Sequence, residues 1–97
     1  MRDFQQRKSF RQDLKRELRG RYRNDVLCPH GELWEIVDIL ARDILLPYSY
    51  HDHALHGDKE GSRECHIRPD LLLVYRYEGD DLLILERLGS HSEILGL

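Results

Sequence analysis

Hydrophobic residues near the start of the chain recur at helical spacing. Phe10, Leu14, Leu18 and Tyr22 follow one another every four residues, which places them in one apolar stripe that faces a core. The polar residues between them complete the pattern of an amphipathic helix. The pattern therefore predicts a first helix over residues 10–22.

A second apolar run has a period close to 3.6 residues and ends before Pro47, which cannot continue a helix. This run predicts a second helix over residues 33–45. Its apolar positions are Leu33, Ile36, Val37, Leu40, Ala41 and Ile44.

The period changes in the second half of the chain. Three strand-like runs, at residues 62–67, 71–77 and 82–87, are separated by turn sequences and predict an antiparallel meander. The middle run begins with five consecutive apolar residues, which favours a central strand covered on at least part of both faces. Residues 3–6 predict a short edge strand, and residues 48–61 predict a long loop because they are rich in His, Gly and Asp.

These elements predict an α+β fold in which two N-terminal helices pack on one face of a small antiparallel sheet. A chain of 97 residues can bury one hydrophobic core, so we expect a single domain over residues 1–97. No apolar run approaches the roughly 20 residues that cross a bilayer, and the first residues lack the apolar segment of a signal peptide. We therefore expect a cytoplasmic protein that makes no membrane contact.

The charge of the chain is distributed unevenly. The net charge is −3, but residues 1–25 carry nine Lys or Arg against four Asp or Glu, whereas residues 26–97 carry six against fourteen. Arg11, Lys15 and Arg19 form a basic stripe on the first predicted helix, which is either an ordinary solvated face or a surface that contacts RNA phosphates. Any binding of nucleic acid is thus expected from the N-terminal segment.

Strand pairing predicts that several polar side chains meet at one end of the sheet. If residues 78–81 close the second hairpin, Leu72 lies opposite Arg87, and the first hairpin brings His66 opposite Leu71. The side chains expected in this patch are His66, Asp70, Arg87 and His91.

The chemistry of this patch suits the cleavage of RNA through its own 2′-hydroxyl. That reaction needs a base for the hydroxyl proton, an acid for the departing 5′-oxygen and positive charge on the phosphorane oxygens. Histidines titrate near neutral pH and serve as base or acid, while arginine presents a planar cationic fork to phosphate. The reaction requires no metal, and we expect no cofactor.

Three segments of the second half of the chain resemble a known family. DHALHG at residues 52–57, RECHIRPDLLLVY at residues 63–75 and LERLGSHSEIL at residues 85–95 are similar, in order and spacing, to the YafQ branch of the RelE/ParE toxin superfamily. The resemblance implies a RelE-like microbial RNase fold and a ribosome-dependent mRNA endonuclease. It also implies that a cognate antitoxin masks the toxin in a heterocomplex, so the expected partners are the antitoxin, mRNA and the ribosome.

The resemblance implies catalytic roles for residues that match the motifs of the family. His53 is the histidine of DHxLxG, His66 and Asp70 belong to HxxPD, and Arg87 and His91 belong to RxGxH. Which histidine is the base and which is the acid stays open. The residues expected to bind substrate are Arg11, Lys15, Arg19, Arg63, Leu71 and Leu95.

The chain departs from the family at three aromatic positions. Leu71 stands where the family often has Trp, Leu95 where it often has Phe, and Lys59 where a loop Trp is common. Losing an aromatic platform weakens base stacking by ~1–3 kcal/mol per base. An alternative is therefore a weak or inactive relative that acts as a protein-binding module.

A third interpretation is a metal-binding protein. Its ligands would come from His51, His53, His56, Cys65 and His66, which are of the types that bind zinc. Neighbouring residues of a strand point to opposite faces, however, so Cys65 and His66 cannot bind the same ion. The two cysteines, Cys28 and Cys65, are expected to be reduced thiols.

Overall fold

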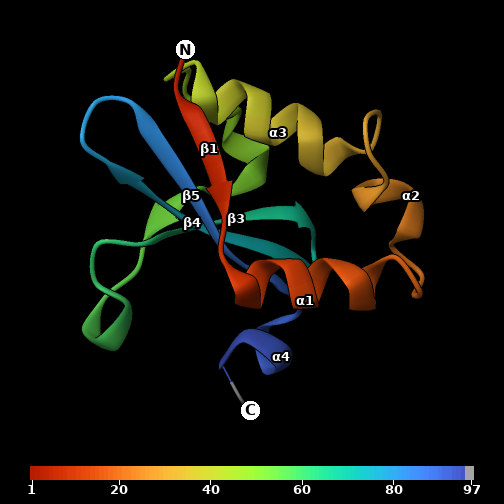
Figure 1. Ribbon diagram of the computed structural model, residues 1–97. Coiled ribbons are helices and arrows are strands. Elements are labelled where there is room, and N and C mark those ends of the chain that lie inside the picture. The colour runs from red at the N-terminus through yellow and green to blue at the C-terminus, as the bar shows by residue number, and fades with distance from the viewer. Residues whose placement is uncertain (96–97) are drawn as a thin grey trace.

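The computed structural model describes residues 1–95 and shows a five-stranded sheet flanked by helices (Figure 1). The sheet order is β1-β5-β4-β3-β2, in which β1 is parallel to β5 and the other neighbours are antiparallel. The strands are β1 (Asp3–Gln6), β2 (His53–Ala54), β3 (Arg63–Arg68), β4 (Leu71–Glu78) and β5 (Leu82–Gly89), and the helices are α1 (Lys8–Glu17), α2 (Arg23–Val26), α3 (Glu32–Ala41) and α4 (His91–Leu95). Within residues 1–95, no helix is long and apolar enough to cross a membrane.

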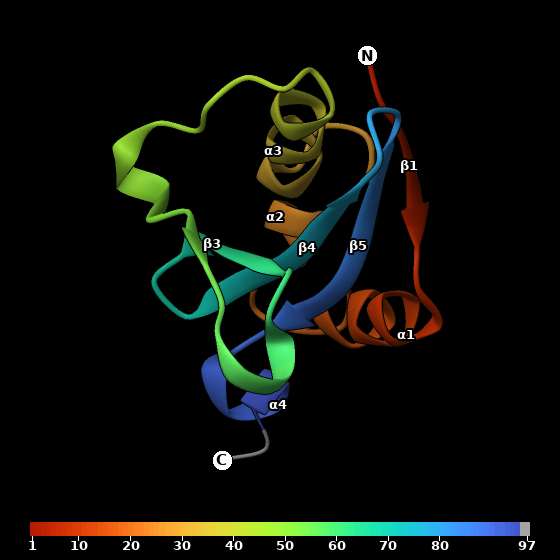
Figure 2. The ribbon, with the colours of Figure 1, turned by 90° about the vertical axis from the view of Figure 1, so that its left-hand side faces the viewer.

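The central strand β4 is buried on both faces of the sheet. Leu71, Leu73 and Tyr75 belong to the core beneath α1, α2 and α3, which we call the helix-side core. The alternate residues Leu72 and Val74 pack with Ile94 of α4 on the other face. Figure 2 shows α4 on the side of the sheet opposite α3. The α+β architecture, the edge strand at residues 3–6 and the doubly covered central strand confirm the predictions from the sequence.

Both predicted helices are too long. The first ends at Glu17, and residues 23–26 form the separate short helix α2. The second ends at Ala41, because Asp43 adopts a left-handed backbone conformation with φ 58°. There Asp43 N–H donates to the carbonyl of Leu40 and Ile44 N–H donates to that of Ile39, which closes the helix in a Schellman motif. The apolar side chain of Ile44 extended the sequence pattern beyond this stop.

The predicted strand register is wrong by one or two residues. Leu72 pairs with Gly89, Arg87 pairs with Val74, and His66 pairs with Leu72. A β-bulge at Glu86 contributes to the error in β5, since Val74 faces Arg87 while the next residue of β4 already faces Leu85, and a second register shift lies between His66 and Arg68 in β3. The predicted loop at residues 48–61 also contains the strand β2 and two short 3₁₀ helices, at Tyr48–Tyr50 and Gly57–Lys59.

Truncating Leu85, which is 0% exposed in the helix-side core, should leave a cavity. We expect Leu85→Ala to lower the free energy of unfolding by about 2–5 kcal/mol in urea denaturation. Leu45→Ala is the matched control, because this leucine is 91% exposed and should change the value by less than about 0.5 kcal/mol. Equal losses in the two variants would contradict the assignment of Leu85 to the core.

Candidate active site

The strand β3 presents two side chains of the candidate site on the face of the sheet opposite α1, α2 and α3. Glu64 and His66 are two residues apart, so strand geometry directs both to the same face. They pair with Val74 and Leu72, which carry the small hydrophobic cluster of that face. We call this surface the histidine face. His53 joins it, because β2 places His53 beside Glu64.

His91 reaches the same face from the first turn of α4. A capping box sets the start of this helix: the amide of Glu93 donates to Ser90 Oγ at 3.1 Å, and the amide of Ser90 donates to Glu93 Oε1 at 2.9 Å. The hydrogen bonds from Ser90 hold the pKa of Glu93 below its ordinary value. The capping box of Ser90 and Glu93 thus fixes the start of α4 and, with it, the position of His91.

Glycine is required at the junction between β5 and α4. Gly89 has a φ of 150°, and a Cβ there would lie 2.4 Å from Arg16 Nη2. The space that glycine leaves lets the Arg16 guanidinium donate to the Leu88 carbonyl at 2.7 Å. Arg16 Nε also lies 2.8 Å from Glu93 Oε2, so α1 is tied to the segment that carries His91.

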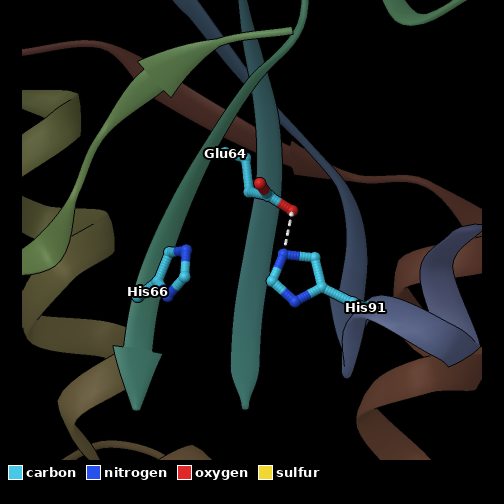
Figure 3. Close-up of side chains that lie close together, drawn as sticks. All are labelled: Glu64, His66 and His91. Atoms are coloured by element: carbon cyan, nitrogen blue, oxygen red, sulfur yellow. Dashed lines mark ion pairs between the residues drawn. The ribbon is translucent and has the colours of Figure 1, made fainter. Parts of the chain in front are cut away.

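The centre of the site is a buried carboxylate surrounded by imidazole rings (Figure 3). Glu64 is 5% exposed, its Oε2 lies 3.1 Å from His53 Nε2, and its Oε1 lies 3.8 Å from His91 Nε2. The ring centroids of His66 and His91 are 5.7 Å apart, and those of His53 and His66 are 6.5 Å apart. Figure 3 shows Glu64 and His66 on β3 and His91 approaching them across β4.

The surroundings of the three rings differ. Burial lowers the pKa of His66, and the nearby histidines lower it further, although the charge of Glu64 opposes them. Neutral imidazole is therefore favoured at His66, and a neutral ring can accept a proton. His53 Nδ1 lies 2.7 Å from the carbonyl of His51, and its Nε2 lies 3.1 Å from Glu64 Oε2.

Arg87 lies on the histidine face, where it pairs with Val74. Its Nε donates to Asp13 Oδ2 at 2.7 Å. Asp13 is 4% exposed and also accepts from the Arg16 guanidinium and from the amide of Leu88. A buried carboxylate of α1 therefore fixes the direction of the Arg87 guanidinium.

Other predicted site residues lie elsewhere. Asp70 is exposed in the turn after β3 and its nearest charged partner is Arg21, at 3.7 Å, so it does not join the histidines through any contact in the described structure. Arg63 binds Asp52 and faces away from His66. Leu71 is fully buried in the helix-side core, so its predicted substrate contact is wrong. The side chain of Leu95 lies outside the described part of the structure.

The basic stripe is exposed to solvent. Arg11 and Lys15 lie on α1, and Arg19 lies in the turn that follows it. The nearby Arg16 does not belong to this surface, because it is paired with Asp13 and Glu93. The stripe therefore offers cations that no carboxylate within residues 1–94 neutralises by an ion pair.

The sequence reasoning missed Glu64 and Asp13. Glu64 stands two residues before His66 in the predicted strand, and this spacing could have placed both on one face. Asp13 stands three residues after Phe10, which is a spacing of one helix face, but a carboxylate at a core position carries no apolar signal.

A metal ion could be held by Glu64, His66 and His91. Their ligand atoms all lie within 4.8 Å of one another, and imidazole with carboxylate suits zinc or copper. This set shares only His66 with the ligands expected from the sequence. Cys65 is buried in the helix-side core, and burial raises the pKa of its thiol, so it remains a neutral apolar side chain.

Comparison with known proteins gives matches over nearly the whole chain. The family model of the YafQ bacterial toxin of type II toxin-antitoxin systems matches residues 2–96. The mRNA interferase toxin YafQ of Escherichia coli K12 is 34% identical over 87 residues, which cover 82% of this chain and 94% of that protein.

Solved structures agree with this match. The E. coli DinJ–YafQ complex contains a chain that is similar with a TM-score of 0.80 and 31% identity, covering 99% of this chain and 100% of that one. A copper-bound mutant toxin from Helicobacter pylori gives a TM-score of 0.83 and 39% identity, covering 97% of this chain and 99% of that one.

The class that follows is a bacterial toxin of a type II toxin-antitoxin system. Within this class the chain belongs to the YafQ family. The resemblance inferred from the three sequence segments is thereby confirmed.

The charge of Glu64 raises the pKa of His66, so its removal should lower that pKa further. In Glu64→Gln we expect the His66 ring, followed by NMR across pH, to titrate at lower pH than in the parent chain. Glu78→Gln removes an equal charge at the far end of β4 and should leave the titration of His66 unchanged. A midpoint that rises or stays constant in Glu64→Gln would refute the electrostatic account.

Proposed function

We propose that this protein is an endoribonuclease that cleaves mRNA on the ribosome by acid-base catalysis through the RNA 2′-hydroxyl. The observation that carries the proposal is the pair of rings of His66 and His91, with centroids 5.7 Å apart over a buried carboxylate. The name of the E. coli relative, an mRNA interferase toxin, supports mRNA as the substrate.

His66 is the general base in this mechanism, because its lowered pKa keeps the ring neutral. It takes the proton of the 2′-hydroxyl, and the 2′-oxygen then attacks the phosphorus. The bond from phosphorus to the 5′-oxygen breaks, and His91 donates a proton to that leaving oxygen. The products are a 2′,3′-cyclic phosphate and a free 5′-hydroxyl.

Glu64 and His53 support this exchange of protons. The carboxylate of Glu64 contacts His53 and His91, so it balances the positive charge of either protonated ring. Glu64 is too deeply buried to bind RNA itself. We assign Glu64 as a positioning residue for the rings of His53 and His91.

Arg87 stabilises the charge that develops on the phosphorane oxygens. Asp13 holds its Nε, and Arg87 Nη2 donates to the carbonyl of Glu93 at 3.3 Å, so the guanidinium is oriented before the substrate arrives. The role of Asp70 remains a proposal that rests on its place in the HxxPD motif. It would contact RNA or the ribosome from the exposed turn.

The partners follow from the family and from charge. The E. coli YafQ structure is a complex with the antitoxin DinJ, and we propose that a cognate antitoxin binds and masks this chain as well. The exposed cations Arg11, Lys15 and Arg19 would contact ribosomal or messenger RNA phosphates. This interaction would give the chain an RNA-binding surface despite its net charge of −3.

A second candidate function is metal binding at Glu64, His66 and His91. The similar mutant toxin of H. pylori is copper-bound, which supports this candidate. A metal ion there would occupy the lone pairs that the proton transfers need, so metal should inhibit cleavage. Cleavage that persists in a chelator and is reduced by added zinc supports the acid-base mechanism, and cleavage that requires metal contradicts it.

Removing either catalytic ring should abolish most activity. We expect His66→Gln and His91→Gln each to lower mRNA cleavage by about 10²–10⁴-fold, and to relieve growth arrest on expression without antitoxin. Binding to the antitoxin should be retained, because only a proton-transfer group is lost. His30→Gln, an exposed histidine outside the site, is the matched control and should cleave like the parent.

Full toxicity of both histidine variants would refute this mechanism. If the parent chain itself fails to cleave RNA with and without ribosomes but still binds an antitoxin, the chain is instead a protein-binding module.

Neutralising the basic stripe should weaken ribosome association and its dependence on salt. Each phosphate contact contributes about 0.7–0.9 to the slope of log affinity against log salt, so Gln at Arg11, Lys15 and Arg19 should reduce the slope by roughly 2–3. Arg42→Gln, an exposed cation at the end of α3 that is paired with Asp38, is the control. An unchanged slope in the triple variant would make the stripe an ordinary solvated face.

A further inference from the structure

A row of aromatic rings leads from the solvent to the proposed catalytic histidines. The ring centroids of Tyr48 and His51 are 5.8 Å apart, those of His51 and His66 are 5.5 Å apart, and those of His66 and His91 are 5.7 Å apart. These separations lie within the range at which aromatic rings contact one another. The two outer rings, Tyr48 and His51, have no part in the mechanism above.

Tyr48 is exposed to an extent that the fold does not explain. Its residue surface is 91% accessible, although a tyrosine ring carries a large apolar area that usually finds cover. Its neighbour Tyr50 is anchored, because its hydroxyl donates to Glu32 Oε1 at 2.8 Å. The 3₁₀ turn is thus fixed at one tyrosine and presents the other to solvent.

His51 is held in an uncommon backbone conformation. Its φ of 49° and ψ of 43° are left-handed, a region that residues with a side chain seldom occupy. Strain of this kind tends to lie where a side chain must be aimed at a ligand. At His51 the left-handed conformation ends the 3₁₀ turn. The imidazole of His51 then lies beside that of His66.

His51 borders a pocket of about 780 Å³ whose lining includes His66 of the proposed catalytic pair. His51, His53 and His66 line one part of it, and Tyr50 lines another. The guanidinium of Arg68 also lines it and is fixed by Asp25 at 2.6 Å and by Glu32. The charges of Arg68 and Glu32 in this lining are paired with each other, so the aromatic rings are what the pocket offers to a base of single-stranded nucleic acid.

We propose that Tyr48 and His51 form a stacking platform for one base of the single-stranded RNA, next to the phosphate that His66 and His91 cleave. Proteins that bind single-stranded RNA stack its unpaired bases on tyrosine and histidine rings. The platform supplies the stacking that is absent at Leu71, whose side chain is buried in the core. This proposal rests on the proposed function, because it uses the same substrate.

The platform is tested by binding to the free, full-length chain, with short 2′-deoxy oligonucleotides that cannot be cleaved. Stacking of one base is worth about 5- to 150-fold in affinity, so Tyr48→Ala and His51→Ala should each weaken binding by a factor in this range. An oligonucleotide with 2-aminopurine at the platform position should lose fluorescence on binding the parent chain, since stacking quenches it. This quenching should disappear in both alanine variants.

Matched variants separate stacking from other roles. Tyr48→Phe and His51→Phe keep an aromatic ring and should retain affinity, although the second loses every proton-transfer group at that position. Leu45→Ala, three residues away and 91% exposed like Tyr48, should bind as the parent does. An oligonucleotide that lacks the stacked base should bind the parent and Tyr48→Ala with equal affinity.

Parental affinity in both alanine variants would overturn the platform. So would an equal loss on the abasic ligand, or no measurable binding by the parent chain. The two proposals fail separately, because His66→Gln should still bind the uncleavable oligonucleotide. If that variant cleaves RNA normally while the stacking results hold, the catalytic assignment is wrong and the platform remains.

Discussion

The burial of β4 on both faces is the constraint on which the rest of the structure depends. One face of β4 buries Leu71, Leu73 and Tyr75 in the helix-side core. The other face buries Leu72 and Val74 in the small hydrophobic cluster beneath the candidate site. Because β3 pairs with β4, the same alternation directs Glu64 and His66 over that cluster. A strand that was polar on one face would leave the carboxylate and the rings in bulk water, where their mutual influence would be screened.

The residues of the candidate site depend on two carboxylates that are almost fully buried. Glu64 links the rings of His53 and His91, and Asp13 links Arg87 to the amide of Leu88. Each holds together segments far apart in the chain, so the site is assembled from the N-terminal helix, the sheet and the C-terminal turn at once. Charge is satisfied inside the protein before any RNA binds, which is the condition for a preorganised site.

Much of the fold and part of the site could be predicted from the sequence. The continuous apolar run at residues 71–75 identified the central strand, and strand pairing predicted that His66 and His91 lie at one end of the sheet, where their rings are 5.7 Å apart. The end of α3 could not be predicted, because an aspartate at position 43 takes the left-handed conformation that usually marks a glycine. Glu64 and Asp13 were also missed. Their role depends on contacts with residues that are distant in sequence, which a local sequence pattern does not reveal.

The bulge at Glu86 carries a consequence for the spacing of the RxGxH motif. Leu83 and Leu85 face the helices, so strict alternation would send Arg87 toward the helices and Leu88 toward the histidine face. The additional residue reverses this order: Arg87 shares the face of Val74, and Leu88 enters the helix-side core. The bulge thus decides which face of the sheet carries Arg87, and Asp13 then orients its guanidinium. A β5 that kept all its residues but lost the bulge would put a guanidinium in the place of a leucine in the core.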